Sequence, residues 1–199
     1  MKTPKINSFK TALNFSLLII MFTSSCAQSG NKSKAQTDTK IEAKEVVEKP
    51  KIDIQMAVLS DNLEAVRQHI ESGTDINKKD AMSGSTPLIS AASFGKNDIV
   101  KALIDAGADL NLKNNDGATA LHVAAFFARI EIVQLLIDAG ADKNLKNNFG
   151  ATARETVNAP YADMKPIYEM VKQQLEPMGL QVDLTEIEKT RPVIAMMLQ

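Results

Sequence analysis

The feature that most constrains this chain is a pattern that recurs at an interval of 33 residues. Gly-Ser-Thr-Pro-Leu at 84–88 returns as Gly-Ala-Thr-Ala-Leu at 117–121 and as Gly-Ala-Thr-Ala-Arg at 150–154. A second marker, Ile-Asp-Ala-Gly-Ala-Asp, begins at Ile104 and again at Ile137. A fixed period of this length predicts a repeat architecture, in which each unit buries its apolar face against its neighbours.

Each unit contains residues suited to a turn followed by two helices. Gly117 suits the turn, and Thr119 can cap the helix that follows it. The small pair Ala124-Ala125 allows helices of neighbouring units to approach closely, and Gly140 suits the left-handed residue that ends the second helix. A related marker at Ile70 lies 34 residues before Ile104, so the loop 79–83 is expected to hold one extra residue. We expect helix pairs at about 52–73, 86–107 and 119–140, and a divergent fourth unit from Gly150.

These motifs resemble the ankyrin repeat, whose unit is a β-turn followed by two antiparallel helices. The likeness is clearest in the Asp116-Gly117 turn and in Thr119-Ala-Leu-His122. The resemblance implies that residues 51–157 form an all-α ankyrin-repeat solenoid with β-turn fingers, followed by C-terminal capping helices. It also implies that His122 bonds backbone groups between repeats. We expect His69, which lies among polar residues, at the surface.

After the repeats the pattern changes, and residues 158–199 are expected to form a C-terminal helical cap. Three elements are predicted: an amphipathic helix over 161–175, a short helix over 183–189 opened by a capping box, and a separate apolar turn over 193–198. The apolar face expected on the first of these comprises Met164, Ile167, Tyr168, Val171 and Leu175. We interpret these elements as a seal over the last repeat, and a docking element for a partner is the alternative.

Residues 1–25 have the three-part layout of a secretory signal. Three lysines precede the apolar stretch 12–22, which is shorter than the roughly 20 residues needed to span a membrane, and small residues lead to Cys26. This arrangement resembles a bacterial lipoprotein leader, which implies cleavage before Cys26 and a lipid on its thiol. An ordinary cleaved signal is the alternative. By the same resemblance, Ala27 favours the outer membrane, and the lack of an acidic cluster just after Cys26 favours a protein that faces the periplasm.

Residues 26–50 are rich in Lys, Glu, Ser, Thr and Gln, and their apolar residues are isolated. A segment of this composition cannot bury enough apolar surface to offset the entropy lost on ordering. We therefore expect a flexible tether between the leader and the repeats.

Composition argues against several functions. Beyond residue 25 the chain has 20 basic and 24 acidic residues, whereas a nucleic-acid-binding protein needs a basic face. The two histidines share no metal-ligand spacing, and carboxylates such as Asp105 and Asp138 recur with the repeat rather than as a catalytic pair. No phosphate-binding glycine motif is present. We expect no catalytic residues, metal, cofactor or small-molecule substrate, and a monomer.

The resemblance implies a protein partner bound along a concave surface made by the turn tips and the first helices. All four phenylalanines beyond the leader fall at or beside positions that this family leaves variable. The expected partner-binding residues are Phe94, Phe126, Phe127, Phe149, Asn115, Asp116, Lys113 and Lys146. Aromatic residues are frequent among binding hot spots. The alternative is that adjacent repeats stack these rings as core.

We therefore expect an envelope-anchored adaptor that binds a protein partner, such as an exported enzyme or toxin that it restrains or supports. A structural scaffold that contacts cell-wall or membrane components is one alternative. A cytoplasmic interaction module with an uncleaved leader is a second, and an enzyme with an unrecognised site is a third.

Overall fold

The structure, a computed structural model, describes residues 49–199. This part of the chain is helical and has no strand. Its elements are α1 (Ile54–Leu59), α2 (Leu63–Glu71), α3 (Pro87–Ser93), α4 (Asn97–Asp105), α5 (Ala120–Phe126), α6 (Ile130–Asp138), α7 (Ala153–Asn158), α8 (Tyr161–Leu175), the 3-10 turn η1 (Glu176–Met178) and α9 (Leu184–Met197). The predicted leader, Cys26 and the tether up to residue 48 lie outside the described residues. From residue 49 onward, no helix combines the length and apolar character that crossing a membrane requires.

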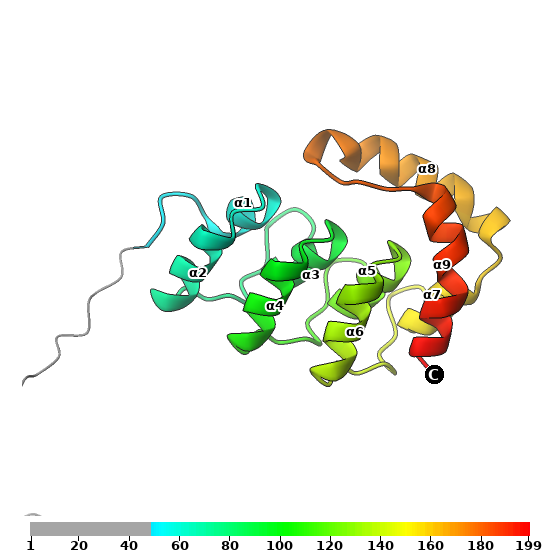
Figure 1. The fold of residues 1–199 in the computed structure, drawn as a ribbon, viewed down its shortest axis with the longest axis horizontal. Coiled ribbons are helices and arrows are strands. Elements are labelled where there is room, and N and C mark those ends of the chain that lie inside the picture. The colour runs from blue at the N-terminus through cyan, green and yellow to red at the C-terminus, as the bar shows by residue number, and fades with distance from the viewer. Residues whose placement is uncertain (1–48) are drawn as a thin grey trace, which may run out of the picture. The chain divides into compact units, whose positions relative to one another are not determined.

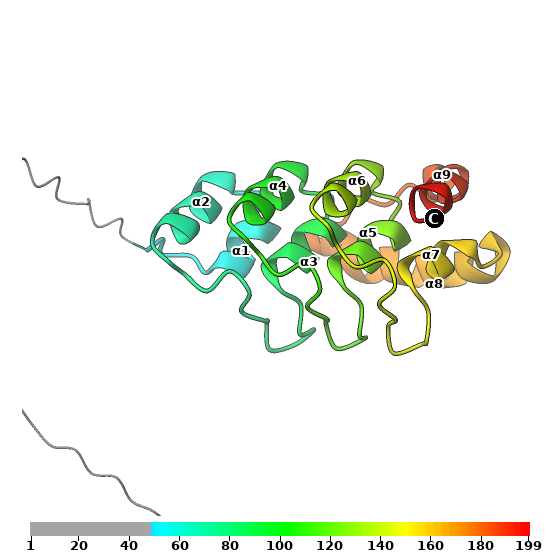
Figure 2. The same ribbon diagram turned by 90° about the horizontal axis from the view of Figure 1, so that it is seen from below.

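The helices stack as pairs in two rows, which Figure 2 shows side by side. One row contains α1, α3, α5 and α7, and the other contains α2, α4, α6 and α9. Turns between successive pairs project away from the second row and form the fingers. The predicted all-α repeat solenoid is confirmed, and the first three helix pairs lie within the residue ranges expected from the period.

The core follows the repeat period. The small pairs Ala91-Ala92 and Ala124-Ala125 are completely buried, so the first helices of neighbouring repeats lie close together. Fully buried side chains on α4 and α6 are Ile99, Val100, Leu103, Ile132, Val133 and Leu136. Each such aliphatic side chain contributes roughly 1.5–3 kcal/mol by leaving water. The buried apolar residues form one continuous cluster that runs through all the repeats, so stability is spread along the stack.

Threonine is the residue before three of the first helices: Thr86 before α3, Thr119 before α5 and Thr152 before α7. Thr86 Oγ1 accepts a 3.3 Å hydrogen bond from the Ile89 amide, which would otherwise lack a partner. Thr152 accepts from the Glu155 amide at 3.2 Å, and the Glu155 carboxylate accepts from the Thr152 amide at 2.7 Å. This reciprocal pair is a capping box. The cap fixes where each first helix starts relative to the finger before it.

The last two helices of the stack, α7 and α9, form a fourth helix pair. α9 packs on α7 and on α6, which is the environment that second helices have in the earlier repeats. Residues 159–183, which include α8 and η1, are inserted between the two members of this pair. The segment expected to be a cap thus contributes its last helix to a fourth repeat.

The predicted break at Pro192 is wrong, because α9 is one helix with Pro192 inside it. Asp183 Oδ1 caps this helix by accepting from the amides of Thr185 and Glu186. Proline inside a helix removes a backbone hydrogen bond and costs about 3 kcal/mol. The buried residues of α9 continue past the proline on one stripe: Ile187, Thr190, Arg191 and Ile194, followed by the cap residue Leu198. Packing of this stripe against the repeats offsets the cost.

The expectation that His69 lies at the surface is also wrong. Its side chain is 5% exposed, although its neighbours in sequence are polar. Nε2 lies 2.8 Å from the Ile52 carbonyl oxygen, and Nδ1 lies 3.0 Å from Thr74 Oγ1. The ring therefore joins the chain before α1 to the loop that follows α2, which is a structural role.

Candidate protein-binding surface

Each finger is closed by one side chain that accepts several amide hydrogen bonds. Asn114 Oδ1 accepts from Asp116 and Ala118, and Asn147 has the same role in the third finger. In the first finger the residue is Asp80, which accepts from the amides of residues 82, 83 and 85. Partial burial alone would raise the pKa of Asp80, but hydrogen bonds from Ser83 and from these amides lower it overall. The extra residue lies in this first finger, as predicted.

A ladder of side-chain hydrogen bonds holds the fingers in register. The bonds run from Asn115 Nδ2 to the Met82 carbonyl (2.9 Å), from Asn148 Nδ2 to the Asn115 carbonyl (2.8 Å), from Lys79 Nζ to the Lys113 carbonyl (2.6 Å) and from Lys113 Nζ to the Lys146 carbonyl (2.8 Å). Two residues expected to bind a partner, Asn115 and Lys113, thus use their side-chain nitrogen atoms to donate hydrogen bonds to a neighbouring repeat. These bonds make the fingers a rigid row.

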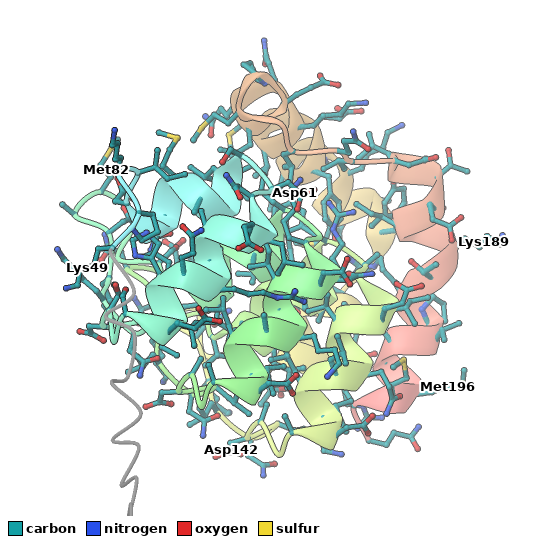
Figure 3. The ribbon with its side chains drawn as sticks, turned by 60° about the vertical axis from the view of Figure 1, so that its left-hand side comes forward. Lys49, Asp61, Met82, Asp142, Lys189 and Met196 are labelled. Atoms are coloured by element: carbon teal, nitrogen blue, oxygen red, sulfur yellow. The ribbon has the colours of Figure 1, made fainter. Side chains whose placement is uncertain are left out.

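The tips of the fingers carry large apolar side chains in water. Met82 on the first finger is 91% exposed, and Phe149 on the third is 81% exposed. Asn115 and Asp116 are exposed on the finger between them, and Lys146 is exposed beside Phe149. Figure 3 shows Met82 at the margin of the molecule, directed away from the helices. Burial of Met82 and Phe149 against a partner would contribute roughly 1.5–3 kcal/mol each.

Two of the other phenylalanines predicted to bind a partner, Phe126 and Phe127, pack against other rings and do not project into solvent. Phe127 is 8% exposed, and its ring meets Phe126 edge to face at 4.9 Å between centroids. The Tyr168 ring of α8 lies 4.5 Å from the Phe126 ring. Phe126, which is partly buried, thus packs between Phe127 of its own repeat and Tyr168 of α8, and not against a ring of an adjacent repeat. Phe94, which caps the end of α3, is partly exposed.

The segment that covers these rings is attached by residues that the sequence interpretation did not assign to a site. Arg191 Nη1 donates to the Tyr168 hydroxyl at 2.7 Å, and the Tyr161 hydroxyl donates to the Leu184 carbonyl at 3.0 Å. Burial raises the pKa of Tyr168, against the opposing effect of Arg191, so the hydroxyl stays neutral. The chain has two tyrosines, both in α8, and this clustering was the available signal.

Arg129, at the start of α6, forms the other attachment. Its Nη2 donates to the Gln181 carbonyl at 2.6 Å, in the loop between η1 and α9. Its Nε is buried and has no hydrogen-bond partner in the described part of the chain. Burial lowers the pKa of this guanidinium.

The geometry provides contacts rather than reaction chemistry. His122 Nε2 lies 3.1 Å from the Ala151 carbonyl oxygen and its Nδ1 lies 2.9 Å from Thr119 Oγ1, so the ring joins two repeats as predicted. Burial is the main reason why the pKa of His122 is lowered. Between residues 49 and 199, no group of three or more His, Cys, Asp or Glu side chains could hold a metal ion.

A stack of helix pairs with rigid, projecting fingers defines a repeat scaffold of the kind that binds other macromolecules through its surface. Residues 54–147 match the family model for ankyrin repeats in three copies. This part of the chain therefore has the ankyrin-repeat fold. The ankyrin repeat domain of Bcl-3 has a similar solved structure, with a TM-score of 0.51 and 33% sequence identity over 52% of this chain and 45% of that one.

Relatives with similar sequences match only part of this chain. Protein phosphatase 1 regulatory subunit 27 of Homo sapiens is 48% identical over 61 residues, which cover 31% of this chain and 39% of that protein. An ankyrin repeat-containing protein of Schizosaccharomyces pombe is 34% identical over 65 residues, 33% of this chain and 31% of that protein. The chain thus spans less than two fifths of the length of these relatives. Ankyrin repeats indicate protein–protein interaction, and proteins of this kind are typically not catalysts.

Proposed function

We propose that this chain is an adaptor that binds a protein partner through the finger tips and the adjoining surface of the first helices. The observation that carries the proposal is the exposure of Met82 and Phe149 at the tips of two fingers. An isolated exposed apolar residue is ordinary, but two large ones on one rigid row, with no packing role there, favour a contact surface. Asn115 and Asp116 supply polar contacts between them.

Similarity to a regulatory subunit of a phosphatase supports a further step. We propose that the partner is an enzyme or toxin whose activity the adaptor restrains or supports. The ladder between fingers favours this role, because a surface that is already rigid loses little conformational entropy on binding. A scaffold that contacts cell-wall or membrane components is the second candidate, and its binding would follow the polar segment before residue 50 rather than the finger tips.

The proposal also places the adaptor in a bacterial envelope, held by a lipid on Cys26 and facing the periplasm at the outer membrane. Its support is the sequence of the first 26 residues. Growth with an alkyne analogue of palmitate tests it: we expect label on the full chain and on a Ser25→Ala variant, and none on Cys26→Ser. Label that persists on Cys26→Ser would contradict lipidation at this thiol.

A crosslinked pull-down from envelope extract tests the binding proposal. The bait is the full chain, compared with a Met82→Ser, Phe149→Ser double variant. Met196→Ser is the matched control, because Met196 is exposed on α9 and lies on the opposite side of the molecule from Met82 (Figure 3). We expect one protein that the parent and the control capture and that the double variant loses. Equal capture by all three would contradict binding through the finger tips.

A further inference from the structure

The helix α8 lies on the repeats without being part of their stack. The fourth pair is complete without it, because α7 and α9 contact each other and also the helices of the preceding pair. Figure 1 shows α8 running back from the end of the solenoid, after which the chain returns to α9. An insertion between two helices that already pack together is not needed to close the core.

The attachment of α8 depends on few buried contacts. Of its 15 residues, only Tyr168 is buried. Met164, Val171 and Leu175, predicted for the same face, are partly exposed, and Ile167 is exposed. A segment with so few buried apolar side chains opens locally at a lower free energy than the helices of the core.

Both ends of α8 provide points about which the helix can move. Ala159 and Pro160 have extended backbone, with ψ angles of 146° and 132°. At the other end Gly179 has a φ of 92°, in the left-handed region. Rotation at these residues leaves the hydrogen bonds within α7 and α9 intact, so α8 can leave as a unit.

Departure of α8 would uncover a surface of defined chemistry. We call it the Phe126 surface, and it comprises Phe126 and Arg191, the two residues that Tyr168 of α8 contacts. Phe126 offers a ring for stacking, and Arg191 Nη1 offers a donor at the position of the Tyr168 hydroxyl. Arg129 Nη2 donates to the Gln181 carbonyl, which lies beyond Gly179, so this bond can persist when α8 leaves. An amphipathic helix with one tyrosine satisfies both Phe126 and Arg191.

We infer that α8 is a reversible cover, and that the Phe126 surface binds an amphipathic helix of a protein partner with a tyrosine in place of Tyr168. This inference rests on the proposed function and names the chemistry of the partner. α8 itself shows the kind of ligand that this surface accepts. The partner and α8 compete for the Phe126 surface. The larger the fraction of molecules in which α8 covers this surface, the lower the apparent affinity for the partner.

Hydrogen exchange measured by mass spectrometry on the full chain tests the mobility of α8. We expect amides of α8 to exchange at least tenfold faster than those of α7 and α9. Tyr168→Ala should accelerate exchange in α8 further and leave α7 and α9 protected, whereas Met170→Ala, on the exposed side of α8, should change neither. Loss of protection in α7, α8 and α9 together would show that α8 belongs to the core and would overturn the inference.

A labelled synthetic peptide of residues 159–182 tests the surface. We expect the full chain with Tyr168→Ala to bind this peptide at least tenfold more tightly than the parent or the Met170→Ala chain. A peptide with alanine in place of Tyr168 should not bind, and one with phenylalanine should bind more weakly because it cannot accept from Arg191. Equal binding by the three chains, or by all three peptides, would overturn the inference.

These outcomes are separable from those of the proposed function. Failure of the pull-down to find a partner leaves the exchange and peptide measurements unchanged. Suppose that capture of the partner depends on Met82 and Phe149, but that α8 neither opens nor is replaced by the peptide. The inference about α8 would then be overturned, and the proposed function would stand.

Discussion

At the scale of single residues, the connection between the two helices of a repeat requires a left-handed backbone. Asp61, Gly95 and Ala128 occupy this position in successive repeats, with φ of 56°, 69° and 56°. Gly95 has a second role, because the Arg129 side chain of the next repeat lies over it. A β-carbon at residue 95 would lie 3.1 Å from the guanidinium carbon of Arg129.

Gly95→Ala should therefore destabilise the fold for two reasons. The left-handed backbone costs an L-residue about 1–2 kcal/mol, and displacement of Arg129 adds to this cost. Gly107→Ala is the matched control, since Gly107 has a φ of 80° but nothing within 4 Å of an added β-carbon. Urea unfolding should show a larger loss in the free energy of unfolding for Gly95→Ala than for Gly107→Ala. Equal losses would mean that the Arg129 contact contributes nothing.

His122 should make stability depend on pH. Burial lowers its pKa in the folded state below the ordinary value of about 6.5. The unfolded chain then binds the proton more readily, so the contribution of His122 is fully present above about pH 6.5 and is lost as pH falls through the folded pKa. We expect the melting temperature of the parent to fall over this range more steeply than that of His122→Gln. Parallel curves would contradict a buried neutral ring.

At the scale of elements, the sequence predicted helices best where local signals and the repeat period agree. Threonine precedes α3, α5 and α7, glycine follows the second helices of the first three repeats, and apolar residues recur at helical spacing, all close in sequence. The continuity of α9 was missed because a local rule favours a break at Pro192, whereas the packing that offsets it comes from α6 and α7. Contacts between distant segments decide such cases.

Replacement of the two prolines inside helices tests this account. Pro192→Ala should raise the free energy of unfolding by about 1–3 kcal/mol, because α9 is part of the stack and gains a backbone hydrogen bond. Pro166→Ala is the paired variant, since Pro166 lies inside α8. It should leave global unfolding almost unchanged and slow hydrogen exchange only in α8. A global gain from Pro166→Ala equal to that from Pro192→Ala would contradict the separation of α8 from the stack.

At the scale of the whole molecule, the stack could be predicted because each repeat contacts its neighbours. The position of α8 could not, since it depends on Tyr168 meeting Phe126 across a long sequence separation. The same contact explains why the predicted site residues differ in exposure. Phe149, Asn115 and Asp116 are exposed on the fingers, whereas Tyr168 of the inserted helix packs on Phe126.

The central claim is that a protein partner binds the row of finger tips. Isothermal titration of the captured partner with the full chain measures this most directly, beside Met82→Ser, Phe149→Ser and the Met196→Ser control. The account predicts that the double variant binds at least tenfold more weakly, a loss of about 1.4 kcal/mol or more, while the control binds like the parent. Equal affinity of the parent and the double variant, with both folded, would contradict it.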